Sequence, residues 1–501
     1  MKAPLSSSQD LLWRGQCIDP QSPLYNMAHT FRLEGPIKPE RFKTAFAALV
    51  RAFDSLSITI QSEDGEPYQQ IAERLVFHEY VEMPEADWTG SAFEAWVQQR
   101  VEQPMDLTVR AYDSCLIKRA TDRYVWFFNL HHIITDATST FSMYTFLAKV
   151  YEGANDTPPT TFTAYLEAER ALRTGARRDN ISTHWKEREQ LMLPNSFYGQ
   201  SSKPTGTAST RSQLRIEPSI KDRFERAVLE APYRALSPHL SRFAMLSTAL
   251  AAYIHRVSGR SEVTIGAPAT NRLGALYRES AGLLIEVLPL RVTIDTADTF
   301  QSLHSKVVRE VQLFLSLSEP GVINSTLARG IDVVLNYIPL KFGEFAGVPC
   351  HAGWHHSGHV DSNHLLRIQV FDFNDPGSFD FYFDFNDTYW SNDNKSRAEA
   401  HFKKIFNELI EAPSRLINDF DLTTPSERDL LDASLVSTLT PEGPLLSDAL
   451  RSTDREYPHQ VALVQENQTV SYAELDSKSN QIAAALRAGG VSTGSRVMIH
   501  M

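Results

Sequence analysis

The sequence is poor in cysteine, has no long apolar run and carries only a moderate excess of negative charge. Its three cysteines among 501 residues are far apart and odd in number, so they imply neither a disulfide framework nor a zinc cluster. The net charge of −12 argues against nucleic acid as a partner. No stretch approaches a membrane span, and residues 1–13 lack the layout of a secretory signal. A cytoplasmic protein without membrane contact is expected.

Length and hydrophobic patterning indicate several folded units. Hydrophobic residues make up 42% of the chain, which is typical of packed globular domains, and 501 residues exceed what one ordinary core can hold. Strand and helix patterns alternate over 1–175 and again over 176–430, so the expected fold class is mixed α/β (α+β). A polar stretch at 431–446 is typical of a linker. Residues 447–501 predict a helix, two short strands, a helix and a final strand, too little for a core.

Two strands expected within residues 110–134 lead to the most informative stretch of the chain. They are joined at Thr121-Asp122, and the second ends in "NLHHIITDATS", after which a helix is predicted from residue 139. A hairpin is expected at 56–71, with Asp64-Gly65 as its turn. Residues 193–212 are expected to form an exposed connection.

The histidine pair is the candidate centre of chemistry. His131 and His132 are adjacent, and Asp136 follows the second by four positions. This spacing is weak evidence alone, but four further segments accompany it in order: Leu5–Trp13, Thr264–Arg272, Gly282–Arg291 and Thr469–Val497. On these segments the chain resembles the condensation domain of nonribosomal peptide synthetases, followed by the opening segment of an adenylation domain.

The resemblance implies a fold of two chloramphenicol-acetyltransferase-like lobes that form a V-shaped pseudo-dimer with a central tunnel. The N-lobe would span 1–175, the C-lobe 176–430, the linker 431–446 and the start of the adenylation domain 447–501. The implied reaction is amide formation, in which a carrier-bound aminoacyl amine attacks a donor acyl thioester. The donor would be held on the phosphopantetheine of a carrier domain or arrive as acyl-CoA.

The same resemblance bears on partners and cofactors. Donor and acceptor carrier domains and the downstream adenylation domain are the expected partners of a monomeric chain. No glycine-rich phosphate loop occurs in the sequence, so no bound cofactor is expected. "WHHSGHVDSNH", Trp354–His364, is rich in histidine, but its spacings fit no single helix face, and a polar loop near the tunnel mouth is preferred to a metal site.

Three residues of the motif receive roles from the resemblance. His132 would be the catalytic residue, as a base or as a group that positions the amine. His131 would support it from the opposite side of an extended segment, because successive side chains alternate. Asp136 could orient the base as in a catalytic triad. The resemblance favours an ion pair from Asp136 to Arg272 instead.

Departures from the family pattern mark further positions. Ala137 stands where the family usually has glycine, and its methyl group would narrow the tunnel toward a small donor. Glu286-Val287 replaces the usual Asn-Thr, and "AFDSLS" at 52–57 departs from another motif. Glu286 and Asn336 are the tunnel and substrate candidates. The departures keep open a second hypothesis, a docking or gating module that does not catalyse, and a third, a stand-alone acyltransferase.

Overall fold

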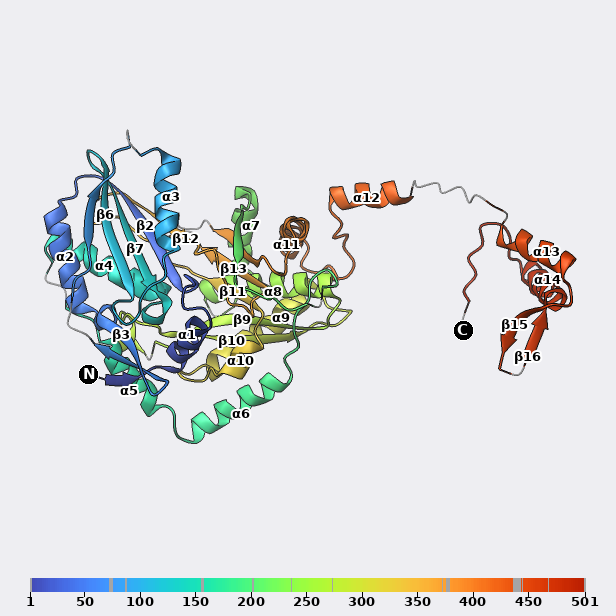
Figure 1. The fold of residues 1–501 in the computed structure, drawn as a ribbon, viewed down its shortest axis with the longest axis horizontal. Coiled ribbons are helices and arrows are strands. Elements are labelled where there is room, and N and C mark those ends of the chain that lie inside the picture. Colours follow the sequence, from blue (N-terminus) through green and yellow to red (C-terminus); the bar gives the residue numbers. More distant parts are fainter. Residues whose placement is uncertain are drawn as a thin grey trace. The chain divides into compact units, whose positions relative to one another are not determined.

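The computed structural model folds into two compact units, Met1–Leu422 and Thr423–Met501. The structure describes residues 2–499 apart from 72–74, 86–87, 155–156, 201, 236, 273, 372, 375–378, 436–442, 444 and 467. Figure 1 labels the elements of both units. Each unit is described by itself below.

A five-stranded sheet organises the first part of unit 1. Its order is β12 (Cys350–His355), β2 (Asn26–Glu34), β7 (Arg123–His131), β6 (Tyr112–Ala120) and β5 (Glu79–Glu82). All neighbours are antiparallel except β5 and β6. The predicted connection between β6 and β7 is confirmed, with Asp122 in the left-handed region at φ 55°.

Helices cover both faces of this sheet. The side chains of Trp126, Phe128 and Leu130 share a core with α2 (Pro39–Ala52) and α4 (Ala137–Glu152). The intervening Val125 and Phe127 share a second core with α3 (Gly90–Val101). Because side chains alternate along a strand, burial of both faces explains the nearly continuous apolar run of β7.

A small sheet and the first helix adjoin this layer. The sheet has the order β1 (Lys2–Pro4), β4 (Glu66–Ile71) and β3 (Ile58–Glu63). The hairpin predicted at 56–71 is formed, and its turn residues Asp64 and Gly65 have φ of 53° and 83°. Helix α1 (Ser7–Ile18) begins with a capping box between Ser6 and Gln9.

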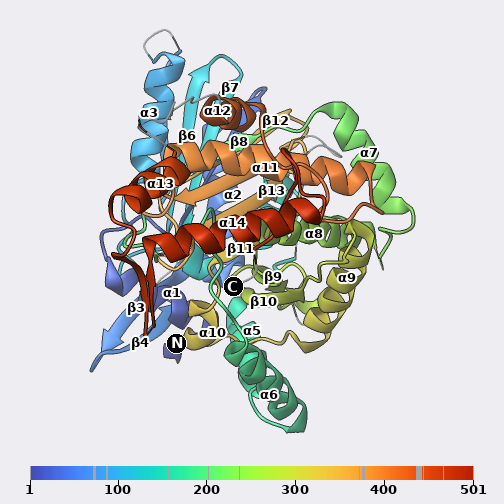
Figure 2. The ribbon, with the colours of Figure 1, turned by 90° about the vertical axis from the view of Figure 1, so that its right-hand side faces the viewer.

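A six-stranded sheet organises the rest of unit 1. Its order is β10 (Ile285–Thr293), β9 (Glu262–Thr270), β11 (Val333–Tyr337), β13 (Leu366–Phe371), β14 (Asp380–Asn386) and β8 (Ser209–Leu214). One face packs against the long helices α8 (Pro238–Ser258), α9 (Phe300–Leu317) and α11 (Asn392–Glu411), together with α7 (Pro218–Leu229). Figure 2 shows α8 and α9 beside β9 and β10. Apolar residues of alternate strand positions fill this core.

The remaining elements of unit 1 are shorter helices. They are η1 (Asp54–Ser57), η2 (His132–Ile134), α5 (Phe162–Ala171), α6 (Ala176–Gln190), η3 (Ala275–Tyr277) and α10 (Ser325–Arg329). Helix α6 buries Ile181 and Trp185 against Ala267 of β9 and Leu288 of β10. It therefore packs on the helix-covered side of the six-stranded sheet, at the edge formed by β10 and β9.

Strand β12 joins the first sheet although it comes late in the sequence. It pairs antiparallel with β2, from Cys350 opposite Leu33 to His355 opposite Ala28. Its residues fall in the range assigned to the C-lobe, and the sequence pattern gave no sign of this pairing. The stretch expected to be a polar loop, Trp354–His364, therefore begins on a strand.

At its start, unit 2 has more helix than the sequence suggested, and near its end it lacks the expected strand. Helix α12 (Pro425–Leu435) begins with reciprocal hydrogen bonds between Thr424 and Glu427, and it extends into the expected linker. Part of the linker, 436–442 and 444, lies outside the described residues. The final strand predicted near the end is not formed over 495–499, where Val497, Met498 and Ile499 are exposed and no described strand pairs with them.

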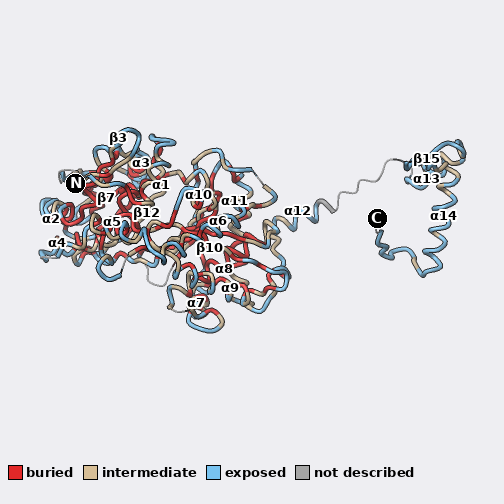
Figure 3. Tube along the Cα trace, turned by 90° about the horizontal axis from the view of Figure 1, so that it is seen from below, coloured by how far each residue is buried: buried red, intermediate tan, exposed pale blue. Residues whose placement is uncertain are grey.

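The rest of unit 2 consists of α13 (Leu446–Glu456), β15 (Val461–Gln465), β16 (Gln468–Ser471) and α14 (Tyr472–Ala488). Neither α13 nor α14 has a buried residue, whereas buried residues run through the five- and six-stranded sheets of unit 1 (Figure 3). This agrees with a segment too small for its own core. Among the described residues, no helix combines the length and apolar character needed to cross a membrane.

Candidate active site

His132 lies where β7 ends and the chain turns toward α4. It is the first residue of the short helix η2, and its backbone N–H donates to the carbonyl oxygen of Tyr25 at 2.8 Å. The side chain is half-buried, unlike that of its buried neighbour His131. Three elements thus fix the position of the ring: the strand, the η2 turn and the segment that carries Tyr25.

The hydrogen bonding of His132 defines the tautomer of its ring. Nδ1 lies 2.8 Å from the carbonyl oxygen of Thr135, which can only accept, so Nδ1 carries the proton. Among the described residues, Nε2 has no hydrogen-bond partner. Burial lowers the pKa of His132 below its ordinary value, against opposing effects from its backbone hydrogen bonds and from Asp136. A neutral ring with an available Nε2 lone pair is suited to accept a proton.

His131 is held as the opposite tautomer. Its Nδ1 accepts the backbone N–H of Ile133 at 3.2 Å, and its Nε2 donates to Oε1 of Gln16 at 3.2 Å. Burial, and then the neighbouring His132, lower the pKa of His131 to about 3. Both ring nitrogens are occupied by the protein, so His131 braces the turn that carries His132.

Asp136 and Arg272 form the ion pair predicted from the sequence. Nη2 of Arg272 lies 2.9 Å from Oδ1 of Asp136, and Nη1 lies 3.1 Å from Oδ2. The Asp136 side chain is 1% exposed and that of Arg272 is 9% exposed. Burial alone would raise the pKa of Asp136, but the charge and hydrogen bonds of Arg272 and the hydrogen bonds of Ser139 outweigh it and lower that pKa.

The same carboxylate ties α4 to the segment that precedes β10. Asp136 is the N-cap of α4 and accepts the backbone N–H of Ser139 at 2.7 Å, while its Oδ2 accepts the N–H of Leu284 at 3.1 Å. Ser139 Oγ lies 2.8 Å from the carbonyl of Gly282 and accepts the N–H of Gly282 at 3.1 Å. Nothing in the sequence analysis singled out Ser139.

The close approach at this junction depends on glycine. A Cβ on Gly282 would lie 2.1 Å from the ring of Phe162, so no side chain fits there. Since Asp136 faces Arg272, Ser139 and Leu284, and His132 Nδ1 faces Thr135, the carboxylate does not orient the imidazole. The triad interpretation of Asp136 is therefore wrong.

Ala137 has an unstrained backbone. It is the first residue of α4, so it adopts right-handed helical angles, and it is half-buried beside the core of the first layer. The replacement of glycine by alanine is thus compatible with the local conformation. Whether its methyl group restricts the donor stays a prediction.

Glu286 occupies a different place from the other candidates. It is 4% exposed on β10, and its carboxylate accepts three consecutive backbone N–H groups, those of Gly321 at 2.6 Å, Val322 at 3.1 Å and Ile323 at 3.2 Å. Burial raises the pKa of Glu286 to about 7, although these hydrogen bonds oppose the shift. Both oxygens are engaged by this loop, so the expectation that Glu286 contacts substrate is not supported by its geometry.

Asn336 lies on the face of the six-stranded sheet opposite its helices. It is half-buried on β11, and its Nδ2 donates to Oε1 of Gln369 on β13 at 2.8 Å. Nothing in the sequence analysis singled out its polar neighbours, Arg367 and Asp384. Among the described residues, no group of three or more histidine, cysteine, aspartate or glutamate side chains is arranged to hold a metal ion.

Comparisons with known proteins agree with this geometry. The sequence model of the condensation domain family matches residues 1–316, and that of the AMP-binding enzyme family matches residues 450–501. The isonitrile lipopeptide synthase of Streptomyces coeruleorubidus is 24% identical over 99% of this chain and 34% of its own length. The dimodular nonribosomal peptide synthase of Bacillus subtilis (strain 168) is 24% identical over 97% of this chain and 21% of its own length. The chain thus spans only a part of these relatives.

Solved structures show the same fold for unit 1. The starter condensation domain of rhizomide synthetase, in complex with C8-CoA, superposes with a TM-score of 0.73 at 22% identity, covering 84% of this chain and 98% of that one. The first condensation domain of the CDA synthetase gives a TM-score of 0.73 at 18% identity, covering 85% and 99%. The predicted mixed α/β fold of the chloramphenicol-acetyltransferase type is confirmed.

Proposed function

Because this chain belongs to the condensation domain family of nonribosomal peptide synthetases, we propose that it joins an amine to an acyl thioester, with His132 managing the transferred proton. The observation that carries the proposal is the state of the His132 ring. It is neutral, its proton is fixed on Nδ1 by the Thr135 carbonyl, and Nε2 is available at the junction of the two sheets.

The proposed chemistry balances without an added reactant. The acceptor amine attacks the thioester carbonyl carbon, a C–N bond forms and the carbonyl oxygen becomes negative. Nε2 of His132 takes the proton that the amine loses. The C–S bond then breaks, the carbonyl is restored, and the leaving thiolate takes that proton. A thioester is already activated, so alignment of the two reactants supplies much of the remaining rate.

The ion pair of Asp136 and Arg272 would keep this geometry rigid. It joins the N-cap of α4, four residues after His132, to the segment before β10. Because this buried pair fixes the segment that carries His132, the imidazole is already oriented when the substrates bind. Asp136 and Arg272 are positioning residues in this proposal.

Substrates and partners follow from the family and its relatives. The acceptor would be an aminoacyl group on the phosphopantetheine of a carrier domain, and the donor would be carrier-bound or an acyl-CoA. A related starter condensation domain was solved with C8-CoA, which supports an acyl-CoA donor as one option. No cofactor bound to this chain is needed, and an adenylation domain is the expected source of the loaded amino acid.

The test is amide formation by the full chain with aminoacyl acceptors on carrier domains and a panel of acyl-CoA and acyl-pantetheine donors. Wild type should form amide from at least one pair, and His132→Ala should reduce the rate at least about a hundredfold, as loss of a general base does. His239→Ala is the matched control, since His239 is an exposed histidine on α8, and it should retain the wild-type rate.

Two results would contradict the proposal. Absence of amide from every donor, with acceptor carriers still bound, would favour a docking module. Equal rates for wild type and His132→Ala would exclude the role of that ring.

A further inference from the structure

The six-stranded sheet carries a cluster of polar side chains on the face turned away from its helices. On β13 the side chains of Leu366, Ile368 and Val370 enter the helix-covered core, so Arg367 and Gln369 lie on the other face. Their neighbours on that face are Asn336 of β11, Asp384 of β14 and Arg211 of β8. These five residues are called the polar face below.

Asp384 is the anchor of the polar face. It is fully buried and accepts Nε and Nη2 of Arg211 at 2.6 and 2.9 Å, and Nε of Arg367 at 3.0 Å. Gln369 Nε2 adds a further bond at 3.2 Å. Burial alone would raise the pKa of Asp384, but the charges of Arg211 and Arg367 outweigh it and hold that pKa well below its usual range. Two guanidinium groups share one carboxylate, so one positive charge is unbalanced.

Arg211 and Arg367 differ in their contacts and in the exposed fraction of their side chains. Arg211 lies over the ring of Trp354 at 5.0 Å, and its side chain is 12% exposed. Arg367 binds Asp384 through Nε alone, and its side chain is 24% exposed. Among the residues that the structure describes, neither terminal nitrogen of Arg367 has a hydrogen-bond partner. Those terminal nitrogens form a fork of N–H donors that matches a carboxylate.

The charge of Arg367 acts on the surroundings of His132. Tyr25 accepts the backbone N–H of His132 through its carbonyl, and its hydroxyl donates to Oδ1 of Asp361 at 2.8 Å, in the loop before β13. The positive charge of Arg367 acts on a histidine in each of the two segments that these hydrogen bonds connect, His132 and His364. After the larger effect of burial, it contributes to lowering the pKa values of both His132 and His364.

Nearby groups of the protein do not neutralise Arg367. Burial lowers the pKa of His356 to about 3, so this neighbour of Asp384 adds no charge at neutral pH. Asp361 is engaged by Tyr25 and lies 3.7 Å from His364, and in the described structure it forms no ion pair with Arg367. A half-buried cation without a full partner is stabilised when a ligand supplies the anion.

We propose that Arg367 is a specificity-determining residue that binds a carboxylate of one of the two substrates, placed over the polar face within reach of His132. The proposal rests on the amide-forming function above and narrows its substrate class. The carboxylate comes either from a dicarboxylic donor acyl group or from an acidic side chain of the acceptor amino acid. Asn336 and Gln369 would lie beside it as neutral hydrogen-bonding groups.

Binding is measured with the full chain in the His132→Ala background, so that the result does not depend on turnover. Each probe is an acyl group joined to aminopantetheine through a stable amide. The donor arm compares succinyl with succinamoyl, and the acceptor arm compares aspartyl with asparaginyl. Within each pair only a carboxylate is exchanged for a carboxamide. Isothermal titration calorimetry gives the dissociation constants.

In either the donor or the acceptor comparison, the carboxylate probe should have a dissociation constant roughly tenfold lower than that of its carboxamide. This difference is what a charge-assisted hydrogen bond contributes to binding. Arg367→Gln should reduce that preference below about twofold, while Arg367→Lys should keep part of it. Arg188→Gln is the matched control, because Arg188 forms a partly buried ion pair with Glu310 outside the polar face, and it should retain the preference. Asp384 keeps its two bonds from Arg211 in Arg367→Gln, so that variant should fold.

Equal binding of both members in both arms would overturn the proposal, and so would a preference that survives Arg367→Gln. These outcomes are distinct from failure of the proposed function. If the protein makes no amide but binds carboxylate probes through Arg367, the proposed amide-forming function is wrong and the carboxylate site is supported. If it makes amide without a carboxylate preference, the function is supported and the carboxylate site is wrong.

Discussion

Replacing Asp136 with alanine should destabilise unit 1 severely. The side chain accepts contacts from Arg272, Ser139 and Leu284 while 1% exposed. Its loss leaves the Arg272 charge buried without a partner, which costs about 3–5 kcal/mol. Loss of the α4 N-cap adds about 1 kcal/mol. A total of about 4–6 kcal/mol is a large part of the roughly 5–15 kcal/mol that stabilises a folded domain.

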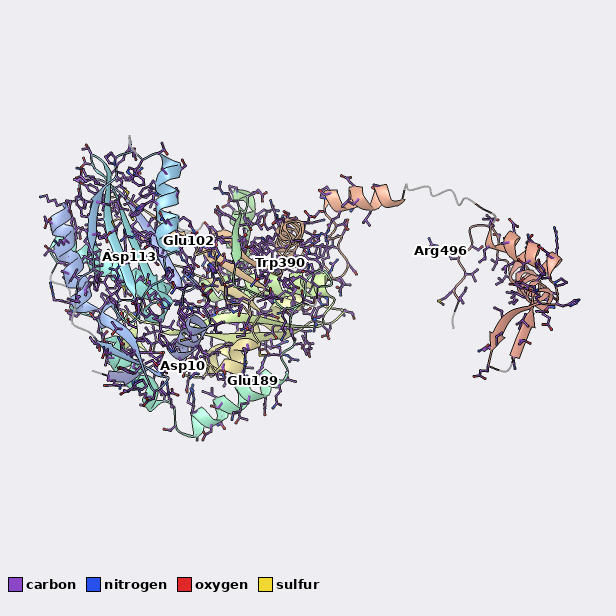
Figure 4. All side chains as sticks on the ribbon, viewed as in Figure 1. Asp10, Glu102, Asp113, Glu189, Trp390 and Arg496 are labelled. Atoms are coloured by element: carbon purple, nitrogen blue, oxygen red, sulfur yellow. The ribbon has the colours of Figure 1, made fainter. Side chains whose placement is uncertain are left out.

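Thermal unfolding followed by circular dichroism measures this effect. Unit 1 ends at residue 422, so an unfolding entropy of about 2.1 cal/mol/K per residue predicts a fall in Tm of about 5–7 °C. Asp10→Ala is the control, because Asp10 (Figure 4) forms a partly exposed pair with Arg14 on α1, and it should change stability by less than about 1 kcal/mol. The double variant Asp136→Asn with Arg272→Gln should cost less than the two single changes together. A Tm for Asp136→Ala within about 1 °C of wild type would refute the reasoning.

Three further predictions concern neighbouring residues. Burial lowers the pKa of His131 to about 3 from 6.5, so this group stabilises the fold fully above pH 6.5 and loses that contribution as pH falls toward 3. His131→Gln should therefore reduce the slope of the free energy of unfolding against pH, measured with urea between pH 3 and 6.5, by up to about 1.4 kcal/mol per pH unit. An unchanged slope would contradict a buried, neutral His131. Glu286→Gln places an amide group against backbone N–H donors and should lower the free energy of unfolding in urea by about 1–3 kcal/mol. Substrate preference should not change, and a changed preference would identify Glu286 as a substrate contact. Ala137→Gly should lower stability by no more than about 1 kcal/mol and broaden donor acceptance in the amide assay, and unchanged acceptance would remove the tunnel-narrowing hypothesis.

The sequence predicted the local elements well where their patterns were self-contained. The β6–β7 connection, the hairpin at Asp64-Gly65 and the helix after the histidine pair are formed where they were expected. In each case turn residues and period-two or helical spacing act over short distances. The Asp136–Arg272 pair could be predicted because the resemblance supplied the long-range partner that spacing alone does not give.

What the sequence could not predict depends on contacts between distant segments. The pairing of β12 with β2 joins residues more than three hundred positions apart, and no local pattern encodes it. Glu286 was expected near substrate because its motif position is unusual, yet three N–H groups of a distant loop determine its environment. Arg367 was not singled out from the sequence, because its contact with Asp384 joins two strands and leaves its terminal nitrogens available only in the folded chain.

The chemistry proposed for this chain depends on a neutral His132 ring with its proton on Nδ1. A ¹⁵N NMR titration of histidine-labelled protein, with His132 assigned by comparison with His132→Ala, tests this directly. The structure predicts a protonated Nδ1, an unprotonated Nε2 and a titration midpoint below 6.5. A ring protonated on Nε2, or one that is charged at neutral pH, would contradict the account.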